Sequence, residues 1–192
     1  MQQMNQVDFL TRFQHPIIIN QLPDFPLKKV KRQAAVLCPV VCRDELTVLF
    51  TQRSAHLRHH PGQICFPGGG YEQSDASLKD TALRETEEEI GLSRRYTRVI
   101  GEMQKFRTVS GYEVTPYVAL VNPDFDLRVD SNEVSHVFEV PLSYLVDQRN
   151  HIQEPVRRNG VDYSIYFIPW ADTYIWGATA AFVRILSNHL NG

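Results

Sequence analysis

The chain has 192 residues and a mass of 22.1 kDa, and 43% of its residues are hydrophobic, which suits one globular domain with a sizeable core. The 20 Lys and Arg side chains nearly balance the 22 Asp and Glu side chains, for a net charge of −2 at pH 7. This balance excludes a broadly cationic protein that binds nucleic acid. The sequence also lacks the roughly 18 apolar residues of a membrane span and the pattern of a secretory signal. We therefore expect a cytoplasmic protein with no membrane or nucleic-acid partner.

Turn residues and hydrophobic periodicity divide the chain into successive elements. Residues 1–33, which contain Pro16, Pro23 and Pro26, suit an extension packed on the domain, and residues 34–192 suit a single domain. The one helix between strands and the one at the end favour an α/β (α+β) sandwich with a mixed sheet between helices. The expected elements, in chain order, are a β-hairpin over 34–41 and 46–53, a helix over 77–90 closed by Gly91, strands over 96–109, 113–121 and 133–140, a short helix after Pro141, a strand over 161–170 and a closing helix over 176–190.

The segment RETEEEIGL, residues 84–92, gathers three carboxylates on one face of the expected helix. At about 100° per residue, Glu85 and Glu89 lie roughly 40° apart, and Glu88 lies about 60° to the other side of Glu85. Like charges spaced i,i+4 destabilise a helix by about 0.2–0.5 kcal/mol. A divalent cation would offset this repulsion, because carboxylate oxygens suit Mg²⁺ or Mn²⁺. The glycine-rich turn at residues 67–70 could supply a carbonyl to a metal or an amide to a phosphate. The alternative is a solvated glutamate-rich helix with no metal dependence.

Residues 69–92 resemble the signature of the Nudix hydrolases, G-x(5)-E-x(7)-R-E-U-x-E-E-x-G-U, in which U is aliphatic. Thr86 stands where an aliphatic residue is usual. The first acid is Asp75 instead of Glu, and eight residues instead of seven separate it from Arg84. Asp75 is therefore either the supporting acid of this signature or a turn or N-cap residue. The matching residues are Gly69, Arg84, Glu85, Glu88, Glu89, Gly91 and Leu92.

The resemblance implies a Nudix-like α/β/α sandwich and a Mg²⁺- or Mn²⁺-dependent hydrolase that cleaves a diphosphate linked to another moiety. The Gly69 carbonyl, Glu85 and Glu89 would be metal ligands, and Glu88 a ligand or the catalytic base. Arg84 would orient Glu85 through a charge-assisted hydrogen bond. Glu133 is a second candidate for the base, because related enzymes often place another acid near the metals in this region. The metals would bridge phosphate oxygens and lower the pKa of the attacking water.

The segment LFTQRSAHLRHHPGQICFPGG, residues 49–69, resembles the motif LLTxRSxxxRxxxGxxxFPGG of the coenzyme A pyrophosphatase branch of this family. The implied reaction is hydrolysis of coenzyme A to 3′,5′-ADP and 4′-phosphopantetheine, with acyl and oxidised forms as further candidate substrates. Arginine suits bidentate contacts with phosphate, although Arg53 could instead form a structural ion pair. The resemblance assigns substrate binding to Arg53, Ser54, Arg58, Gly62 and Phe66.

The sequence is also compatible with two other functions. A Nudix pyrophosphatase acting on ADP-ribose or another nucleoside diphosphate derivative would use the same chemistry on a different substrate. A catalytically inactive Nudix-like module that binds a ligand should lack one or more of the metal carboxylates, whereas Glu85, Glu88 and Glu89 are all present. The sequence decides neither the oligomeric state nor which glutamate is the base.

Overall fold

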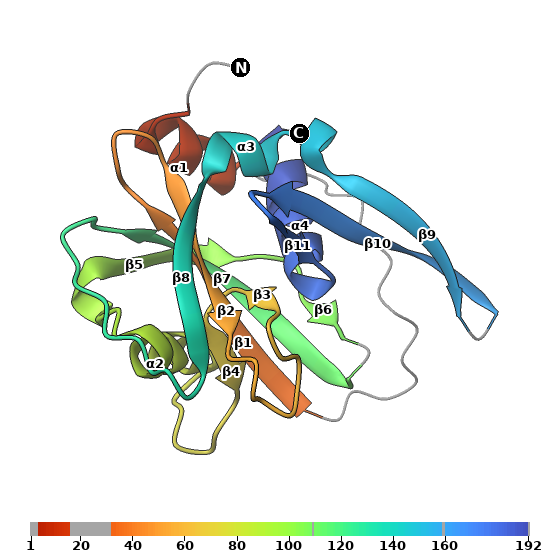
Figure 1. Cartoon of the computed structure of the whole chain (residues 1–192). Helices are drawn as coiled ribbons and strands as arrows, with labels where there is room; N and C mark the ends of the chain where they lie inside the picture. The colour runs from red at the N-terminus through yellow and green to blue at the C-terminus, as the bar shows by residue number, and fades with distance from the viewer. Residues whose placement is uncertain (1–3, 16–31, 109, 159, 192) are drawn as a thin grey trace.

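A computed structural model describes residues 4–15, 32–108, 110–158 and 160–191 (Figure 1). Its helices are α1 (Gln6–Gln14), α2 (Leu78–Ile90), α3 (Leu142–Val146) and α4 (Ala178–Asn191), with the 3₁₀ helices η1 (Arg94–Tyr96) and η2 (Gln148–Asn150). Its strands are β1 (Arg32–Val41), β2 (Thr47–Arg53), β3 (Ile64–Cys65), β4 (Gly68–Gly70), β5 (Thr97–Glu102), β6 (Phe106–Arg107), β7 (Tyr112–Val121), β8 (Val134–Pro141), β9 (Ile152–Arg158), β10 (Val161–Trp170) and β11 (Thr173–Trp176).

The central sheet is mixed, as the sequence predicts. Its main path runs β3-β2-β1-β7-β5, while β4 pairs with β1, β6 with β7 and β8 with β2. β1 and β7 are parallel, in a register that places Ala35 opposite Thr115, and the other pairs are antiparallel. Because both faces of β1 are covered, its sequence is an almost continuous apolar run.

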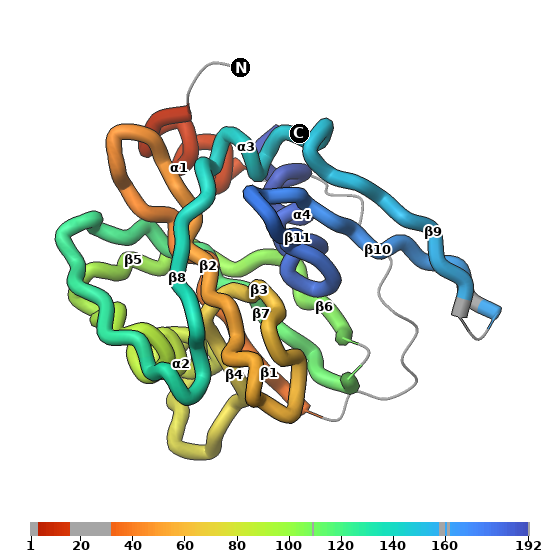
Figure 2. The backbone as a smooth tube through the Cα atoms, in the orientation of Figure 1, coloured from red at the N-terminus to blue at the C-terminus, as the bar shows by residue number. Residues whose placement is uncertain are grey.

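Helices cover the two faces of this sheet, so the predicted sandwich is confirmed. Ala35 and Leu37 of β1 pack with Ala82 of α2. Cys38 and Val40 of the same strand belong instead to the large core that contains the apolar face of α4. Figure 2 shows α1 and α3 beside α4 and apart from α2. The sheet thereby holds α2, which carries the acidic residues, against β1 and β4.

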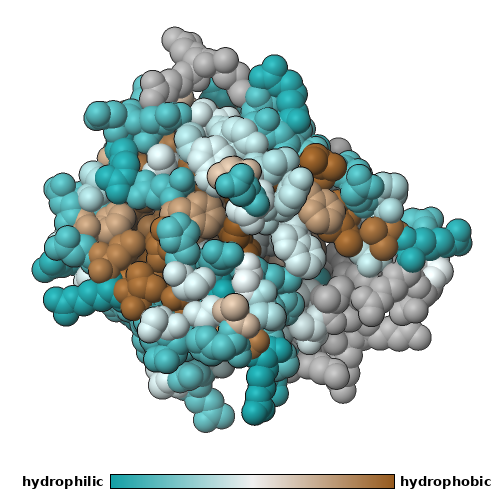
Figure 3. All heavy atoms as spheres, viewed as in Figure 1, coloured by the Kyte–Doolittle hydropathy of each residue, from teal (hydrophilic) through white to brown (hydrophobic). Residues whose placement is uncertain are grey.

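The last three strands of the chain, β9, β10 and β11, form a second, separate sheet. The strand predicted over residues 161–170 is confirmed as β10, whereas β9 and β11 were not predicted. β9 and β10 form a long hairpin that extends away from the central sheet (Figure 1). Figure 3 shows a largely polar visible face with one apolar patch at the left of the view and a smaller one at the right, over this hairpin. Ile152, which begins β9, is 43% exposed.

The single strand predicted over residues 96–109 is wrong. β5 ends at Glu102, the amide of Met103 donates to the Pro116 carbonyl, and the chain pairs again with β7 as β6. A register shift between Val99 and Gly101 marks a β-bulge or a similar irregularity in the pairing of β5 with β7. Residue 109 itself lies outside the described residues.

The extension predicted for residues 1–33 lies partly outside the described residues. Its described helix, α1, buries Phe9 and Phe13, and the Arg12 Nη1 donates to the Leu190 carbonyl of α4 over 3.2 Å. The boundary predicted at residue 34 falls inside β1, which begins at Arg32. No helix in the described part of the chain is long and apolar enough to span a membrane.

Candidate active site

Helix α2 begins and ends close to the residues that the sequence predicts. The Ser77 hydroxyl caps the helix by accepting from the Asp80 amide over 3.2 Å. Gly91 ends it in a left-handed conformation with φ of 71°, which glycine adopts without steric cost. Thr86, at the usual aliphatic position, is buried and donates its hydroxyl to the Ala82 carbonyl over 2.6 Å, so its polar group is satisfied.

The three glutamates of α2 differ strongly in exposure. The Glu89 side chain is 3% exposed, Glu85 17% and Glu88 59%. Glu87 points elsewhere, because its carboxylate accepts from the Arg94 amide and Nε, over 3.1 and 3.2 Å. The carboxylates of Glu85 and Glu89 are therefore withdrawn from bulk water, whereas that of Glu88 is exposed.

Two glycines of β4 place these two carboxylates. The Gly68 amide donates to Glu89 Oε2 over 3.2 Å. The Cα of Gly69 packs so closely on Glu85 that an added Cβ would lie 2.6 Å from Oε1. Only a residue without a side chain permits this approach, so the glycine turn and the acidic helix form one site.

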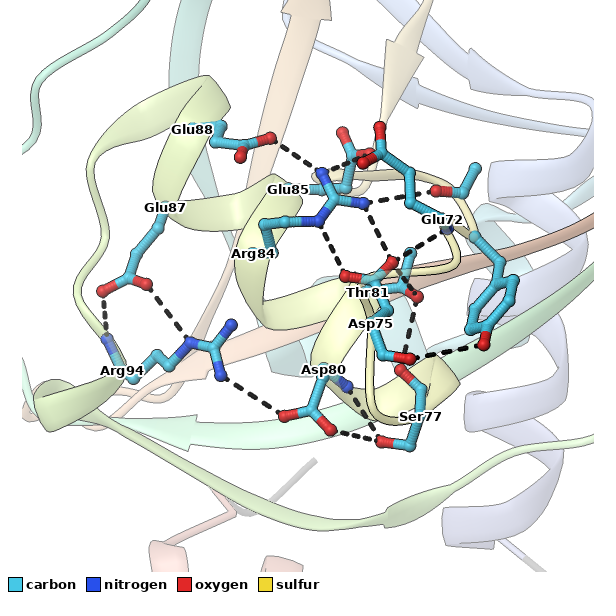
Figure 4. Close-up of polar contacts among 12 residues, drawn as sticks. Glu72, Asp75, Ser77, Asp80, Thr81, Arg84, Glu85, Glu87, Glu88 and Arg94 are labelled. Atoms are coloured by element: carbon cyan, nitrogen blue, oxygen red, sulfur yellow. Dashed lines mark hydrogen bonds and ion pairs between the residues drawn. The ribbon is translucent and has the colours of Figure 1, made fainter.

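The guanidinium of Arg84 contacts three acidic side chains, those of Asp75, Glu85 and Glu88 (Figure 4). Its Nε and Nη2 donate to the two carboxylate oxygens of Asp75 over 2.8 and 3.1 Å. Its Nη1 donates to Glu88 Oε2 over 2.8 Å and lies 3.0 Å from Glu85 Oε1. A guanidinium held on one side by a bidentate partner presents its remaining hydrogens in a fixed direction.

Asp75 is this bidentate partner of Arg84, and the helix N-cap is Ser77. The carboxylate of Asp75 also accepts from the Thr81 hydroxyl over 2.8 Å and from the Glu72 amide over 3.0 Å. The hydrogen bonds from Arg84 hold the pKa of Asp75 well below its usual range. Asp75 is shorter than the Glu of the Nudix signature and is separated from Arg84 by one more residue. Its carboxylate nevertheless reaches Arg84.

Burial and mutual repulsion make the site favourable for a cation. Burial raises the pKa of Glu89 to about 8, against the opposing effect of the Gly68 amide and of Arg53. Burial also raises the pKa of Glu85, and the charge of Glu133 acts in the same direction on both glutamates. Glu133 therefore lies close enough for its charge to act on Glu85 and Glu89.

The donor set suits a divalent cation, although in the part of the chain that the structure describes no group of three or more His, Cys, Asp or Glu side chains is placed to hold a metal ion. Glu85 and Glu89 offer hard oxygen ligands, and Gly69 adds a backbone carbonyl beside them. Both carboxylates are shielded from water and carry raised pKa values, and a bound cation would favour their charged forms.

Two residues predicted to bind substrate are buried, which favours a structural role for both. Phe66 is 2% exposed, and its ring stacks on Phe50 and Phe182 at centroid distances of 5.0 and 6.4 Å. Ser54 is 3% exposed and donates its hydroxyl to the Ser131 carbonyl over 2.9 Å. The Ser54 amide also donates to the Glu133 carbonyl, so this residue fixes the segment that carries Glu133. A sequence motif does not reveal burial of this kind.

The other three residues lie at or near one loop. Arg53 ends β2 with its Nη1 3.9 Å from Glu89 Oε1, which places it beside the acidic cluster. Gly62 has φ of 69° and donates its amide to the Arg53 carbonyl over 3.1 Å, which closes the loop. Arg58 is exposed on that loop.

A cleft of about 720 Å³ adjoins the acidic cluster, and most of its lining was not predicted. Arg32 and Tyr112 meet there because β1 and β7 pair in parallel, and they are 80 positions apart in the sequence. No local pattern in the sequence signals such a meeting. The residues that line the cleft are Arg32, Gln33, Gly70, Tyr71, Glu72, Glu85 and Tyr112.

Comparison with known proteins gives the family. The family model described as the NUDIX domain matches residues 31–159. The chain belongs to the Nudix hydrolase family. This Nudix hydrolase is 40% identical over 180 residues to the uncharacterized Nudix hydrolase NudL of Shigella flexneri, covering 94% of this chain and 92% of the relative. It is 38% identical over 184 residues to NudL of Yersinia enterocolitica, covering 96% and 92%.

Solved structures share the fold of this Nudix hydrolase. DR0079 from Deinococcus radiodurans superposes with a TM-score of 0.53 at 15% identity, covering 87% of this chain and 88% of that one. RenU, a Nudix hydrolase from M. smegmatis, superposes with a TM-score of 0.50 at 20% identity, covering 60% and 74%. The family model and the NudL relatives make the protein a Nudix pyrophosphohydrolase, and members of this family generally depend on a divalent metal and act on small molecules.

Proposed function

We propose that this Nudix hydrolase cleaves the diphosphate of coenzyme A, or of an acyl or oxidised form, into 3′,5′-ADP and 4′-phosphopantetheine, with Mg²⁺ or Mn²⁺. The observation that carries the proposal is the match of residues 49–69 to the coenzyme A pyrophosphatase motif at ten fixed positions. The contacts of that motif support it. Its last residues, Gly68 and Gly69, adjoin Glu89 and Glu85, and Arg53 faces Glu89.

In this proposal Glu85, Glu89 and the Gly69 carbonyl hold the cation, with Glu88 as a further ligand. When bound, the cation neutralises diphosphate charge and makes the attacking water more acidic. Arg84 is a positioning residue, because its bidentate bond to Asp75 aims its third nitrogen at Glu85 and Glu88. Arg53, Arg58 and the turn at Gly62 are the residues of the motif that we retain for binding substrate phosphates.

We assign the catalytic base to Glu133 in preference to Glu88. The Glu88 carboxylate already accepts a charge-assisted hydrogen bond from Arg84 over 2.8 Å, so one of its oxygens is occupied. Glu133 is exposed, its charge acts on Glu85 and Glu89, and its carboxylate makes no hydrogen bond with any other described residue. Water attacks one phosphorus, the bond from that phosphorus to the bridging oxygen breaks, and Glu133 takes the proton from the water.

Product analysis tests the substrate. Coenzyme A, dephospho-coenzyme A, ADP-ribose and a dinucleoside polyphosphate are each incubated with the enzyme and Mg²⁺ or Mn²⁺, and the products are identified by chromatography and mass. We expect 3′,5′-ADP and 4′-phosphopantetheine from coenzyme A, at the highest kcat/KM of the set. A higher kcat/KM for ADP-ribose, or no turnover of any compound, would overturn the proposal.

Matched variants test the residues. Glu85→Gln and Glu89→Gln should each lower kcat by more than the ~10–100-fold that the loss of a partner outside the metal shell costs. Glu87→Gln is the control on the same helix, because Glu87 contacts Arg94 and points away from the site. Glu133→Gln should lower kcat with little change in KM. Unchanged kcat in Glu133→Gln together with a large loss in Glu88→Gln would reverse the assignment of the base.

A further inference from the structure

The cleft of about 720 Å³ extends from Glu85 to the start of β1 and β7, and its chemistry differs from that of the acidic cluster. Arg32 and Tyr112 are register partners in these two parallel strands. The Arg32 Nη1 donates to the Tyr112 hydroxyl over 3.3 Å, so a cation and an aromatic ring lie together at the cleft wall.

Tyr71 contributes a second aromatic ring to the same cleft. Its hydroxyl donates to the Asp75 carbonyl over 3.3 Å, and its amide donates to the Gln33 carbonyl over 3.0 Å. The residue is thus held at both ends, while 43% of its surface stays exposed. An anchored but open aromatic face is suited to stacking against a flat base.

The positive charge of Arg32 has no carboxylate partner in the described part of the chain. Among the residues that the structure describes, no carboxylate lies within salt-bridge distance of Arg32, whereas Arg84 and Arg94 each pair with acids. The acids of the cleft are Glu72 and Glu85, and Glu85 is a proposed metal ligand. An exposed guanidinium beside two phenol rings matches a ligand that has both a π-system and a phosphate group.

We propose that this cleft binds the nucleoside half of the substrate, with the base against Tyr71 and Tyr112 and the ribose 3′-phosphate paired with Arg32. This inference rests on the proposed function. Outside the diphosphate, the pantetheine half of coenzyme A carries no phosphate and no aromatic ring, so it would leave Arg32 unpaired. The nucleoside half carries both. Because Arg32 lines the cleft and Arg58 does not, we assign the binding of the 3′-phosphate to Arg32.

Equilibrium binding of two nucleotides tests this assignment without turnover. Isothermal titration calorimetry compares adenosine 3′,5′-bisphosphate with 5′-AMP, which lacks only the 3′-phosphate. Wild type should bind the bisphosphate about tenfold more tightly, and Arg32→Ala should abolish that preference while leaving 5′-AMP affinity unchanged. Arg95→Ala, which removes an exposed cation that contacts Tyr96, controls for net charge and should keep the preference.

The aromatic contact has its own pair of variants. Tyr71→Ala should weaken both nucleotides alike, by about tenfold, whereas Tyr71→Phe retains the ring and most of the affinity. Because the side chains of Arg32 and Tyr71 are both exposed, the variants at these two positions should unfold at the wild-type temperature. If Arg32→Ala keeps the full preference, or if Arg58→Ala abolishes it instead, the assignment of the cleft is overturned.

The outcome separates the two proposals. If wild type hydrolyses coenzyme A but Arg32→Ala leaves the nucleotide preference unchanged, the cleft assignment fails and the proposed function stands. If wild type does not hydrolyse coenzyme A but Arg32→Ala removes the preference, the proposed function fails and the cleft remains a site for a 3′-phosphorylated nucleotide.

Discussion

Gly68, Gly69 and Gly70 are consecutive, yet an added methyl group would contact something different at each. At Gly68, with φ of 150°, a Cβ would lie 2.6 Å from the backbone Cα of Val36. At Gly69 the three nearest atoms would all belong to the carboxylate of Glu85, and at Gly70 nothing lies within 4 Å. Replacing each glycine by alanine should therefore give three distinct results.

Gly68→Ala should destabilise the fold, because backbone in β1 cannot move aside easily. The strained φ and the overpacking together should cost at least about 2 kcal/mol, which lowers Tm by about 4–8 °C in a chain of this size. Gly69→Ala should cost less than about 1 kcal/mol, since the Glu85 carboxylate is the far end of a flexible side chain and can rotate away. Gly70→Ala should leave Tm unchanged or raise it slightly.

The three alanine variants should rank differently in metal affinity from the way they rank in stability. Because the Gly69→Ala methyl group displaces Glu85, Mn²⁺ affinity should fall about tenfold or more while the fold remains intact. Differential scanning calorimetry and Mn²⁺ titration followed by electron paramagnetic resonance measure the two quantities separately. If Gly69→Ala loses as much stability as Gly68→Ala, or if it binds Mn²⁺ as wild type does, the contact between this glycine and Glu85 does not position the carboxylate.

Three further substitutions test other contacts. Asp75→Asn breaks a buried ion pair and should lower the free energy of unfolding by about 3 kcal/mol, measured in urea, whereas a loss below about 1 kcal/mol would show that Arg84 needs no such partner. Phe66→Ala should cost about 3–5 kcal/mol while KM for substrate changes little, and the reverse pattern would restore Phe66 to the binding site. Arg43 holds the pKa of Glu139 below its usual range. This carboxylate therefore stabilises the fold above its unfolded-state pKa of about 4.3, and the stabilisation is lost as the pH falls below that value. The difference in unfolding free energy between wild type and Glu139→Gln should shrink from about pH 7 to about pH 3, and a constant difference would contradict this pKa shift.

Local signals in the sequence predict the acidic helix well. Ser77 and Gly91 mark its ends, and the spacing of Glu85, Glu88 and Glu89 places them on one side. Their different exposures depend on how the helix meets the glycine turn, which periodicity alone does not determine. The role of Asp75 also depends on tertiary structure, because a longer loop must fold back to reach Arg84.

Features built from distant residues could not be predicted in the same way. Arg32 and Tyr112 meet only through the parallel pairing of β1 and β7. β11 spans only Thr173–Trp176, and β9 contains Pro155, so neither gives a strong strand pattern. The motif that contains Ser54 and Phe66 indicates a family branch but does not distinguish residues that contact a ligand from residues that hold the loop in place.

The central claim is that Glu85 and Glu89, held on the glycine turn, bind the divalent cation that the reaction needs. Mn²⁺ titration of wild type, Glu85→Gln, Glu89→Gln and the Glu87→Gln control measures this directly by electron paramagnetic resonance. The account predicts that the first two variants lose Mn²⁺ affinity by at least about tenfold, while the control binds as wild type does. Equal Mn²⁺ affinity in all four proteins would contradict it.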